Sequence, residues 1–190
     1  MRAADRIVSM STHDDAHRSS IPGRLSSEQL RVWLTYMRVR LRLSYEMGRQ
    51  LQADSGITLA DYDVLAALYS RDDRTMAVSQ LAQHVGWERS RASHQVDRMA
   101  RRGLVERRRS EIDRRVTEVT LLEEGVTLLR AATPLHFALV QRVFFAGIAT
   151  GEELDRFGST LESIYRTLCD EGSIPPPPAE QPEDRRVGPS

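Results

Sequence analysis

The sequence predicts a mainly α-helical fold with a small β-hairpin, of the winged helix-turn-helix type. Three observations support this fold class. Residues 78–102 read as two helical segments separated by a glycine at position 86, two short β-favouring segments follow at 104–109 and 115–121, and long helical segments flank this block. The order helix, tight turn, helix, hairpin is typical of a winged helix-turn-helix. We therefore expect six helices and one hairpin.

The length and composition predict a folded protein without a membrane segment. A chain of 190 residues that is 40% hydrophobic can form one core-bearing domain. No apolar run approaches the ~18 residues needed to span a bilayer, and the N-terminal residues lack the central apolar stretch of a secretory signal. Cys169 is the only cysteine, which excludes an internal disulfide. We expect a cytoplasmic protein.

The first three helices are expected before the turn glycine. The first is expected over 27–53, where apolar or small residues recur every three or four positions. Thr58, with Asp61 three residues later, resembles a capping box that opens a second helix ending near Ser70. The third helix is expected to start at Ser79, which is a good N-cap residue. Gly86 then supplies the turn.

The remaining elements follow the turn. The fourth helix is expected over about 88–102, with an inward stripe of Ala92, Val96 and Met99. The alternation at 116–121 favours a strand. A fifth helix is expected over about 123–146, and Thr150 with Glu153 predicts a capped start for the sixth.

These elements predict three parts of the chain. Residues 1–24 are polar and are expected to form a disordered arm, and residues 172–190, with four consecutive prolines, an extended tail. Residues 25–171 form the structured domain, with the winged helix-turn-helix at 58–121. The flanking helices at 27–53 and 123–171 carry more apolar surface than this small unit can cover. We expect them to bury it in an intertwined homodimer.

The charge distribution indicates a basic face. The net charge of the whole chain is +0, but residues 71–115 hold 12 arginines against 7 acidic residues. Concentration of positive charge in one block is expected of a phosphate-binding surface. Because all 27 basic residues are arginine, their position is more informative than their number.

The second helix of a helix-turn-helix reaches base edges through outward residues near its start. Arginine, serine, histidine and glutamine side chains there can donate hydrogen bonds to bases or phosphates. Arginines at a hairpin tip can enter the neighbouring minor groove, and Asp113 is expected to orient Arg115. The alternative interpretations are a solvated basic helix and a solvated charged turn. The candidate DNA-binding residues are Arg89, Ser90, Arg91, Ser93, His94, Gln95, Arg98, Arg114 and Arg115.

Two motifs carry a family resemblance over about residues 27–171. The segment GLVER at 103–107, followed by DRR at 113–115 and by Leu121 and Gly125, resembles the signature of the MarR family of bacterial repressors. The segment GWERSRASHQ at 86–95 resembles a variant associated with actinobacterial members. One position departs from the family pattern, since Leu122 stands where a threonine usually caps the next helix. Loss of such a cap costs about 1 kcal/mol.

The resemblance implies a dimeric, mostly helical repressor that binds a palindromic operator in double-stranded DNA. Its recognition-helix and wing residues correspond to Ser90, Arg91, Ser93, His94, Arg98 and Arg115. Members of this family typically dissociate from the operator when a small effector, often aromatic or phenolic, binds between the DNA-binding lobe and the dimer interface. Candidate effector-binding residues are Trp33, Tyr36, Met37, Tyr62 and His136, each of which also suits core or dimer packing.

The sequence gives no support for catalysis or for a bound cofactor. No context singles out a catalytic triad, and no glycine-rich phosphate loop is present. The five histidines lack metal-ligand spacing, so we expect no metal site. Two other functions remain open beside a specific regulator: a winged-helix module that binds protein, and a DNA-coating protein of low sequence specificity.

Overall fold

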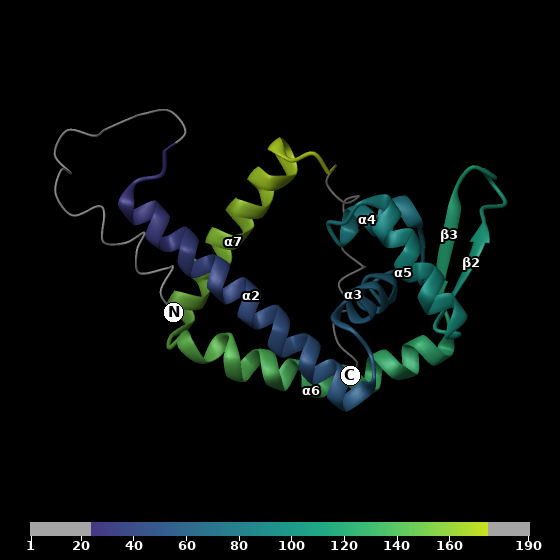
Figure 1. Ribbon diagram of the computed structural model, residues 1–190, viewed down its shortest axis with the longest axis horizontal. Coiled ribbons are helices and arrows are strands. Elements are labelled where there is room, and N and C mark those ends of the chain that lie inside the picture. The colour runs from purple at the N-terminus through teal and green to yellow at the C-terminus, as the bar shows by residue number, and fades with distance from the viewer. Residues whose placement is uncertain (1–23, 175–190) are drawn as a thin grey trace, which may run out of the picture. The chain divides into compact units, whose positions relative to one another are not determined.

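The computed structural model describes residues 24–174, and in this range it contains six α-helices, one short 3₁₀ helix and three strands (Figure 1). The predicted fold class, mainly α with a small β wing, is confirmed. The predicted arm and tail lie almost wholly outside the described residues. The elements are α2 (Ser27–Ser55), α3 (Leu59–Tyr69), β1 (Thr75–Ala77), α4 (Val78–His84), α5 (Arg89–Arg101), β2 (Val105–Arg109), β3 (Thr117–Leu121), α6 (Glu123–Val143), η1 (Phe145–Gly147) and α7 (Gly151–Glu171).

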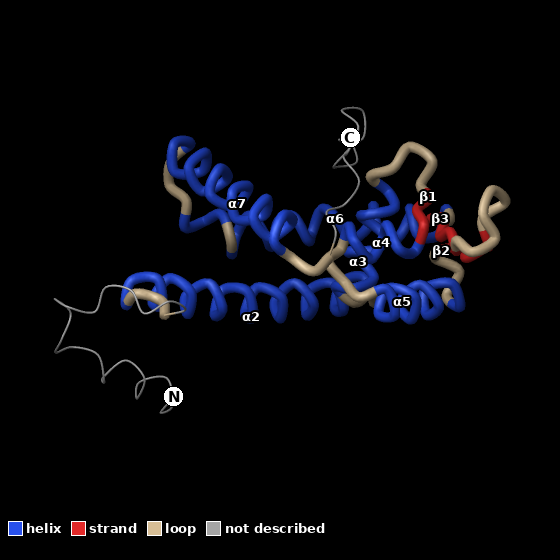
Figure 2. Tube along the Cα trace, turned by 90° about the horizontal axis from the view of Figure 1, so that it is seen from above, coloured by secondary structure: helices blue, strands red, loops and turns tan. Residues whose placement is uncertain are grey.

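The three strands form one antiparallel sheet in the order β1-β3-β2 (Figure 2). The hairpin of β2 and β3, residues 105–121, is the wing. Strand β1 was not predicted, because three residues are too few to display an alternating pattern. Its central residue Met76 is buried and pairs with Val119 of β3. The sheet therefore ties the segment that enters α4 directly to the wing.

Two of the helix caps expected from the sequence are present, and a third is not. The capping boxes of Thr58 with Asp61 and of Thr150 with Glu153 are both present. The prediction that Ser79 caps the third helix is wrong, since α4 already begins at Val78. The N-cap residue is Ala77, which has no side chain that could accept a hydrogen bond, and the side chain of Gln80 accepts the backbone N–H of Ala77 at 3.1 Å. At α6, Leu122 occupies the N-cap without a side-chain hydrogen bond, as its apolar character requires.

Two glycines set the ends of the helices around α5. Gly86 follows α4 with φ of 67°, and Gly103 follows α5 with φ of 71°. Other residue types rarely adopt these left-handed values because their Cβ would crowd the backbone. The turn before α5 and the sharp entry into β2 both depend on this freedom.

One hydrophobic core joins α3, α4, α5, the wing and the start of α6. Leu65, Val96, Val119 and Val126 are among its fully buried side chains. Gly125 lies where α6 meets the wing. A Cβ built there would stand 2.4 Å from the carbonyl oxygen of Leu104 and 2.7 Å from the Leu121 side chain. The first turn of α6 therefore packs directly against both ends of the wing.

The flanking helices differ from this core in exposure. No residue of α7 is buried in the described chain, although its apolar side chains fall on one face. In the N-terminal part of α2, Trp33 and Tyr36 are half exposed and contact each other at 5.5 Å between ring centroids. Within residues 24–174 no single helix has the length and apolarity to cross a membrane, and only the sharply bent pair α6–η1 and α7 meets that test jointly.

Candidate nucleic-acid interface

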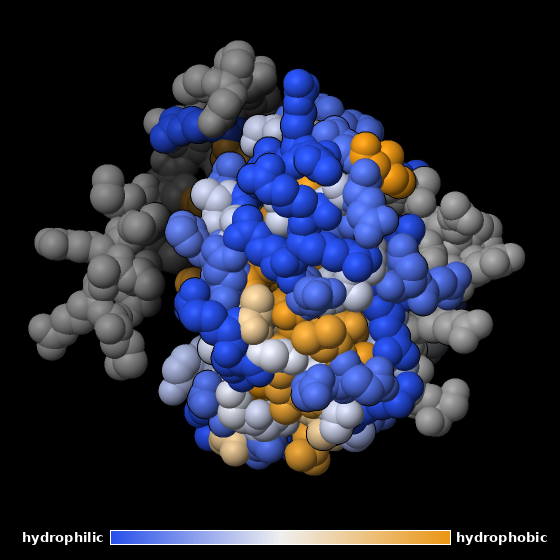
Figure 3. Space-filling model, turned by 90° about the vertical axis from the view of Figure 1, so that its right-hand side faces the viewer, coloured by the Kyte–Doolittle hydropathy of each residue, from blue (hydrophilic) through white to orange (hydrophobic). Residues whose placement is uncertain are grey.

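Helix α5 presents a polar face to solvent. Its inward residues Ala92, Val96 and Met99 are fully buried against the core, as their spacing predicts. In the view onto the wing side, hydrophilic residues cover most of the surface around a narrower apolar strip (Figure 3). Of the predicted DNA-binding residues on α5, five are exposed and Ser93 is partly exposed; the five are Arg89, Ser90, Arg91, His94 and Arg98.

The prediction that Gln95 faces the DNA is wrong. We expected its side chain on the outward face, but only 5% of the residue is exposed. Its amide nitrogen donates to the Oδ1 atom of Asp61 at 2.6 Å, and its amide oxygen accepts from Arg98. Helical spacing alone leaves Gln95 at the border of the buried stripe. The buried carboxylate on α3 then draws it inward, because a desolvated carboxylate requires donors.

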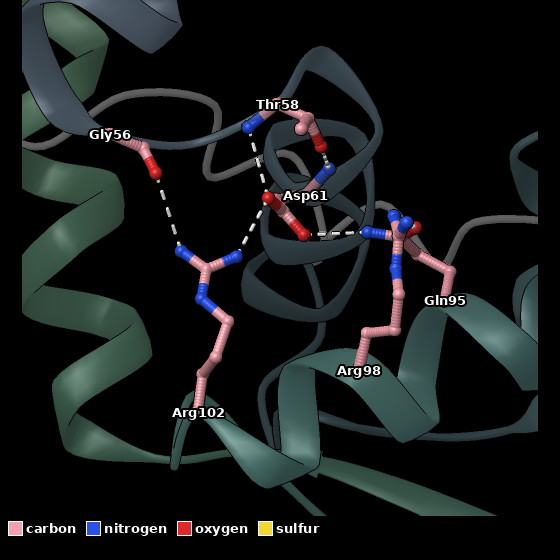
Figure 4. Close-up of polar contacts among 6 residues, drawn as sticks. All are labelled: Gly56, Thr58, Asp61, Gln95, Arg98 and Arg102. Atoms are coloured by element: carbon pink, nitrogen blue, oxygen red, sulfur yellow. Dashed lines mark hydrogen bonds and ion pairs between the residues drawn. The ribbon is translucent and has the colours of Figure 1, made fainter.

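Asp61 is the centre of this network (Figure 4). Only 2% of the residue is exposed, and its two oxygens accept three hydrogen bonds. Oδ1 accepts from Gln95, while Oδ2 accepts from the backbone N–H of Thr58 and from Arg102, each at 2.9 Å. Arg102 follows the last residue of α5. The start of α3 thus holds α5 at both its middle and its end.

A second contact fixes the beginning of α5. The guanidinium of Arg91 lies over the indole ring of Trp87, 4.3 Å from its centroid, in a cation–π arrangement. Nearby, burial raises the pKa of Asp63 to about 6, while the positive charge of Arg91 acts in the opposite direction. Arg91 is therefore held at the protein surface by the indole ring, close enough to Asp63 for its charge to act on that carboxyl. The sequence shows the three residue types but not this grouping.

The base of the wing is anchored to α5. Arg107 of β2 forms an ion pair with Asp97 of α5. Arg108 lies 4.0 Å from Glu118 on the opposite strand. These two arginines therefore serve the structure of the wing, and the arginines of the loop beyond them remain for a partner.

The loop of the wing is ordered by its own hydrogen bonds. Asp113 orients Arg115 through the backbone, since its Oδ1 atom accepts the N–H of Arg115 at 2.9 Å. Arg109 closes the loop by donating to the carbonyl of Arg114 at 3.1 Å. Arg114 and Arg115 are exposed, and Ile112, two residues before Arg114, is 98% exposed. The loop therefore carries two exposed guanidinium side chains and an apolar tip.

The structure brings two of the five effector candidates together. The rings of Tyr62 and His136 lie 4.4 Å apart, and the Tyr62 hydroxyl lies 3.4 Å from the Thr133 hydroxyl. Burial lowers the pKa of His136, and its Nδ1 atom is buried without a hydrogen-bond partner. Trp33, Tyr36 and Met37 belong to the separate N-terminal unit that ends at Leu43.

The side chains that commonly bind metal ions are dispersed over the described part of the chain. Across residues 24–174 no group of three or more histidine, cysteine, aspartate or glutamate side chains could hold a metal ion.

The geometry defines a winged helix-turn-helix protein with a basic face on α5 and the wing. Comparisons with known proteins agree with this class. The MarR family profile matches residues 55–116. The MarR family regulator AbsC of Streptomyces coelicolor is 31% identical, with a TM-score of 0.71 over 78% of this chain and 99% of that chain. No curated protein sequence matches.

Two further solved structures are similar. Sco3205, a MarR family transcriptional regulator of Streptomyces coelicolor in complex with DNA, is 29% identical with a TM-score of 0.74, over 80% of this chain and 99% of that one. CouR of Rhodococcus jostii RHA1, bound to p-coumaroyl-CoA, is 25% identical with a TM-score of 0.60, over 70% and 90%. The chain belongs to the MarR family of transcriptional regulators.

Proposed function

We propose that this protein is a sequence-specific regulator, a repressor, that binds double-stranded DNA at a palindromic operator. One observation carries the proposal: the exposed arginine, serine and histidine side chains of α5 lie in the same lobe as the exposed loop arginines of the wing. The start of α5 would read bases in the major groove, and the wing would contact the neighbouring backbone and minor groove. The DNA-bound relative Sco3205 supports this assignment.

The protein acts as a homodimer in this proposal. The apolar face of α7 is exposed within residues 24–174, and exposing such a face to water is unfavourable. A two-fold dimer would bury it and would present two copies of α5 to the two halves of a palindrome. The protein would work in the cytoplasm, without enzymatic activity or a cofactor.

A small aromatic or phenolic effector would release the protein from DNA. The pair of Tyr62 and His136 supports this part of the proposal, because it joins two rings to an unpartnered ring nitrogen. The relative CouR, bound to p-coumaroyl-CoA, gives further support for an aromatic ligand.

Fluorescence anisotropy tests the proposal. The purified protein is titrated into labelled DNA from upstream of its own gene and into a scrambled duplex, each at two salt concentrations. A specific regulator should prefer its operator by ~10³ or more, with affinity that falls steeply with salt. Binding to both duplexes within about threefold would favour the DNA-coating function. Absence of binding to either would favour a protein partner.

Two substitutions separate the proposed roles of α5 and the wing. Arg115→Ala should weaken binding to both duplexes and reduce the salt dependence, since a phosphate contact is lost. Arg91→Ala should cost about 1–3 kcal/mol on the operator and spare the scrambled duplex. Arg142→Ala, which removes an exposed arginine from α6, is the control. Equal losses on both duplexes would contradict the base contact of Arg91.

A further inference from the structure

The contact between Gln95 and Arg98 has a fixed direction. Asp61 is a carboxylate on the buried side of Gln95 and can only accept hydrogen bonds. The amide of Gln95 must therefore turn its NH₂ group toward Asp61, which leaves its oxygen facing Arg98. The guanidinium of Arg98 has five N–H donors, one of which donates to this oxygen. Because Arg98 is exposed, it forms the surface end of the chain of hydrogen bonds.

We propose that Asp61 and Gln95 are positioning residues that hold the guanidinium of Arg98 ready for DNA. This inference rests on the proposed function and specifies how one of its contacts is set. A free arginine side chain loses considerable rotamer freedom when it binds. Fixing Arg98 before DNA arrives removes part of that loss. The residue that makes the contact lies on α5, and the carboxylate that directs it lies on α3.

The substitution Asp61→Asn reverses the direction of the chain of hydrogen bonds. The new asparagine has one acceptor oxygen, and two donors, the Thr58 N–H and Arg102, converge on the present Oδ2 position. The oxygen should take that position and keep the helix cap, which places the new NH₂ group against Gln95. Gln95 must then turn its own oxygen inward. Its NH₂ group faces Arg98, and Arg98 loses its acceptor.

The substitution Gln95→Glu offers a rescue. By itself it places two carboxylates against each other in a buried site and should destabilise the protein. Combined with Asp61→Asn, it restores the hydrogen bonds that lead to Arg98: the introduced asparagine donates to one oxygen of the introduced glutamate, and the other oxygen accepts from Arg98. Arg102 keeps its hydrogen bond to the asparagine oxygen but loses its ion pair with Asp61. The double variant should therefore hold Arg98 as the wild type does, although each single variant does not.

The experiment measures operator affinity and the order of the Arg98 side chain. Operator affinity comes from anisotropy. The ¹⁵N relaxation of the Nε–H group of Arg98 is measured in the DNA-free protein, with its signal assigned by its loss in Arg98→Ala. Asp61→Asn should lower operator affinity by about 2- to 10-fold, because the cost of ordering one side chain then falls on binding, and should make the Arg98 signal mobile. The double variant should recover both.

A thermodynamic cycle tests whether the effect passes through Arg98. Asp61→Asn should cost nothing further when Arg98 is already alanine, and should keep its full cost when Arg101, another exposed arginine of α5, is alanine. Equal costs in the wild-type and Arg98→Ala proteins would overturn the proposal. So would an Arg98 signal that stays ordered in the Asp61→Asn protein.

The two proposals fail in distinguishable ways. If the wild-type protein does not bind DNA, the proposed function is wrong, and the relaxation measurement still decides whether Asp61 and Gln95 position Arg98. If the wild type binds specifically and the Asp61→Asn protein binds equally well, the DNA-binding function stands and the positioning role is wrong.

Discussion

The winged helix-turn-helix at residues 58–121 and the helix α7 use their apolar side chains in different ways. In the first region, the apolar stripes of α3, α4 and α5 meet the sheet and are buried. In α7 the apolar stripe is just as regular, but every residue on it remains exposed in the described chain. The stripe comprises Leu154, Phe157, Leu161, Ile164, Tyr165 and Leu168.

The folding of the two regions must therefore depend on different conditions. Burial of each apolar side chain contributes roughly 1.5–3 kcal/mol to the free energy of unfolding. The first region gains this stabilisation within one chain. Helix α7 can gain the same stabilisation only by packing against another surface. The stability of residues 58–121 should therefore be independent of protein concentration, whereas the contribution of α7 should depend on it.

The largest effect is expected from a charge on the apolar face of α7. Leu161→Glu should prevent dimer formation, because the carboxylate would be buried without a partner. Loss of the second half-site should lower operator affinity by about 10²–10⁴. Analytical ultracentrifugation and anisotropy would measure both changes. Ser163→Glu, on the opposite face of the same helix, should change neither; equal disruption by both variants would mean that the apolar face is not the interface.

A core truncation in α3 should have a smaller effect of a different kind. Leu65→Ala removes a fully buried side chain and should lower the free energy of unfolding by about 3 kcal/mol. Chemical denaturation should give the same loss at every protein concentration. For Leu161→Ala in α7, the loss should instead shrink as the protein is diluted below the dissociation constant of the dimer. If the loss of unfolding free energy for Leu65→Ala depended on protein concentration, the winged helix-turn-helix would not be stable by itself and the proposed difference from α7 would be wrong.

The smallest effect concerns the partly buried carboxyl of Asp63 in the first region. Its pKa is raised to about 6, so between about pH 4 and pH 6 the folded state binds more protons than the unfolded state. Stability should therefore fall as the pH rises through that interval. Asp63→Asn should remove this loss and, relative to the wild type, gain about 1–2 kcal/mol between pH 4 and pH 7.5, after allowance for solvent screening.

Denaturation of both proteins at several pH values would measure this difference. Comparing the two proteins at each pH cancels the contribution of His136, whose lowered pKa acts in the opposite direction. A difference between the two proteins that does not change with pH would contradict the raised pKa of Asp63.

Local sequence signals predicted most of the fold. Thr58 and Thr150 could be recognised as helix caps, because a capping box needs only two residues three positions apart. The same reasoning failed at Ser79, because the N-cap residue is Ala77, two positions earlier, where the side chain of Gln80 accepts the backbone N–H. Strand β1 was missed because its partner, β3, lies more than 40 residues further along the chain.

The site was less predictable than the fold. Helical spacing correctly assigned the exposed residues of α5, such as His94, and the buried ones, such as Val96. It could not assign Gln95, whose place is decided by Asp61, 34 positions away. It also could not reveal that Arg91 stacks on Trp87. Contacts between distant polar groups leave no periodic signal in a sequence.

The close packing at Gly125 has a mechanical consequence. The first turn of α6 touches the backbone of Leu104, where the chain enters the wing, and the side chain of Leu121, where it leaves. With no clearance at this junction, α6 cannot slide along its axis without displacing both roots of the hairpin. An axial shift of the part of this helix before Pro134 would therefore change the angle at which the wing meets its partner.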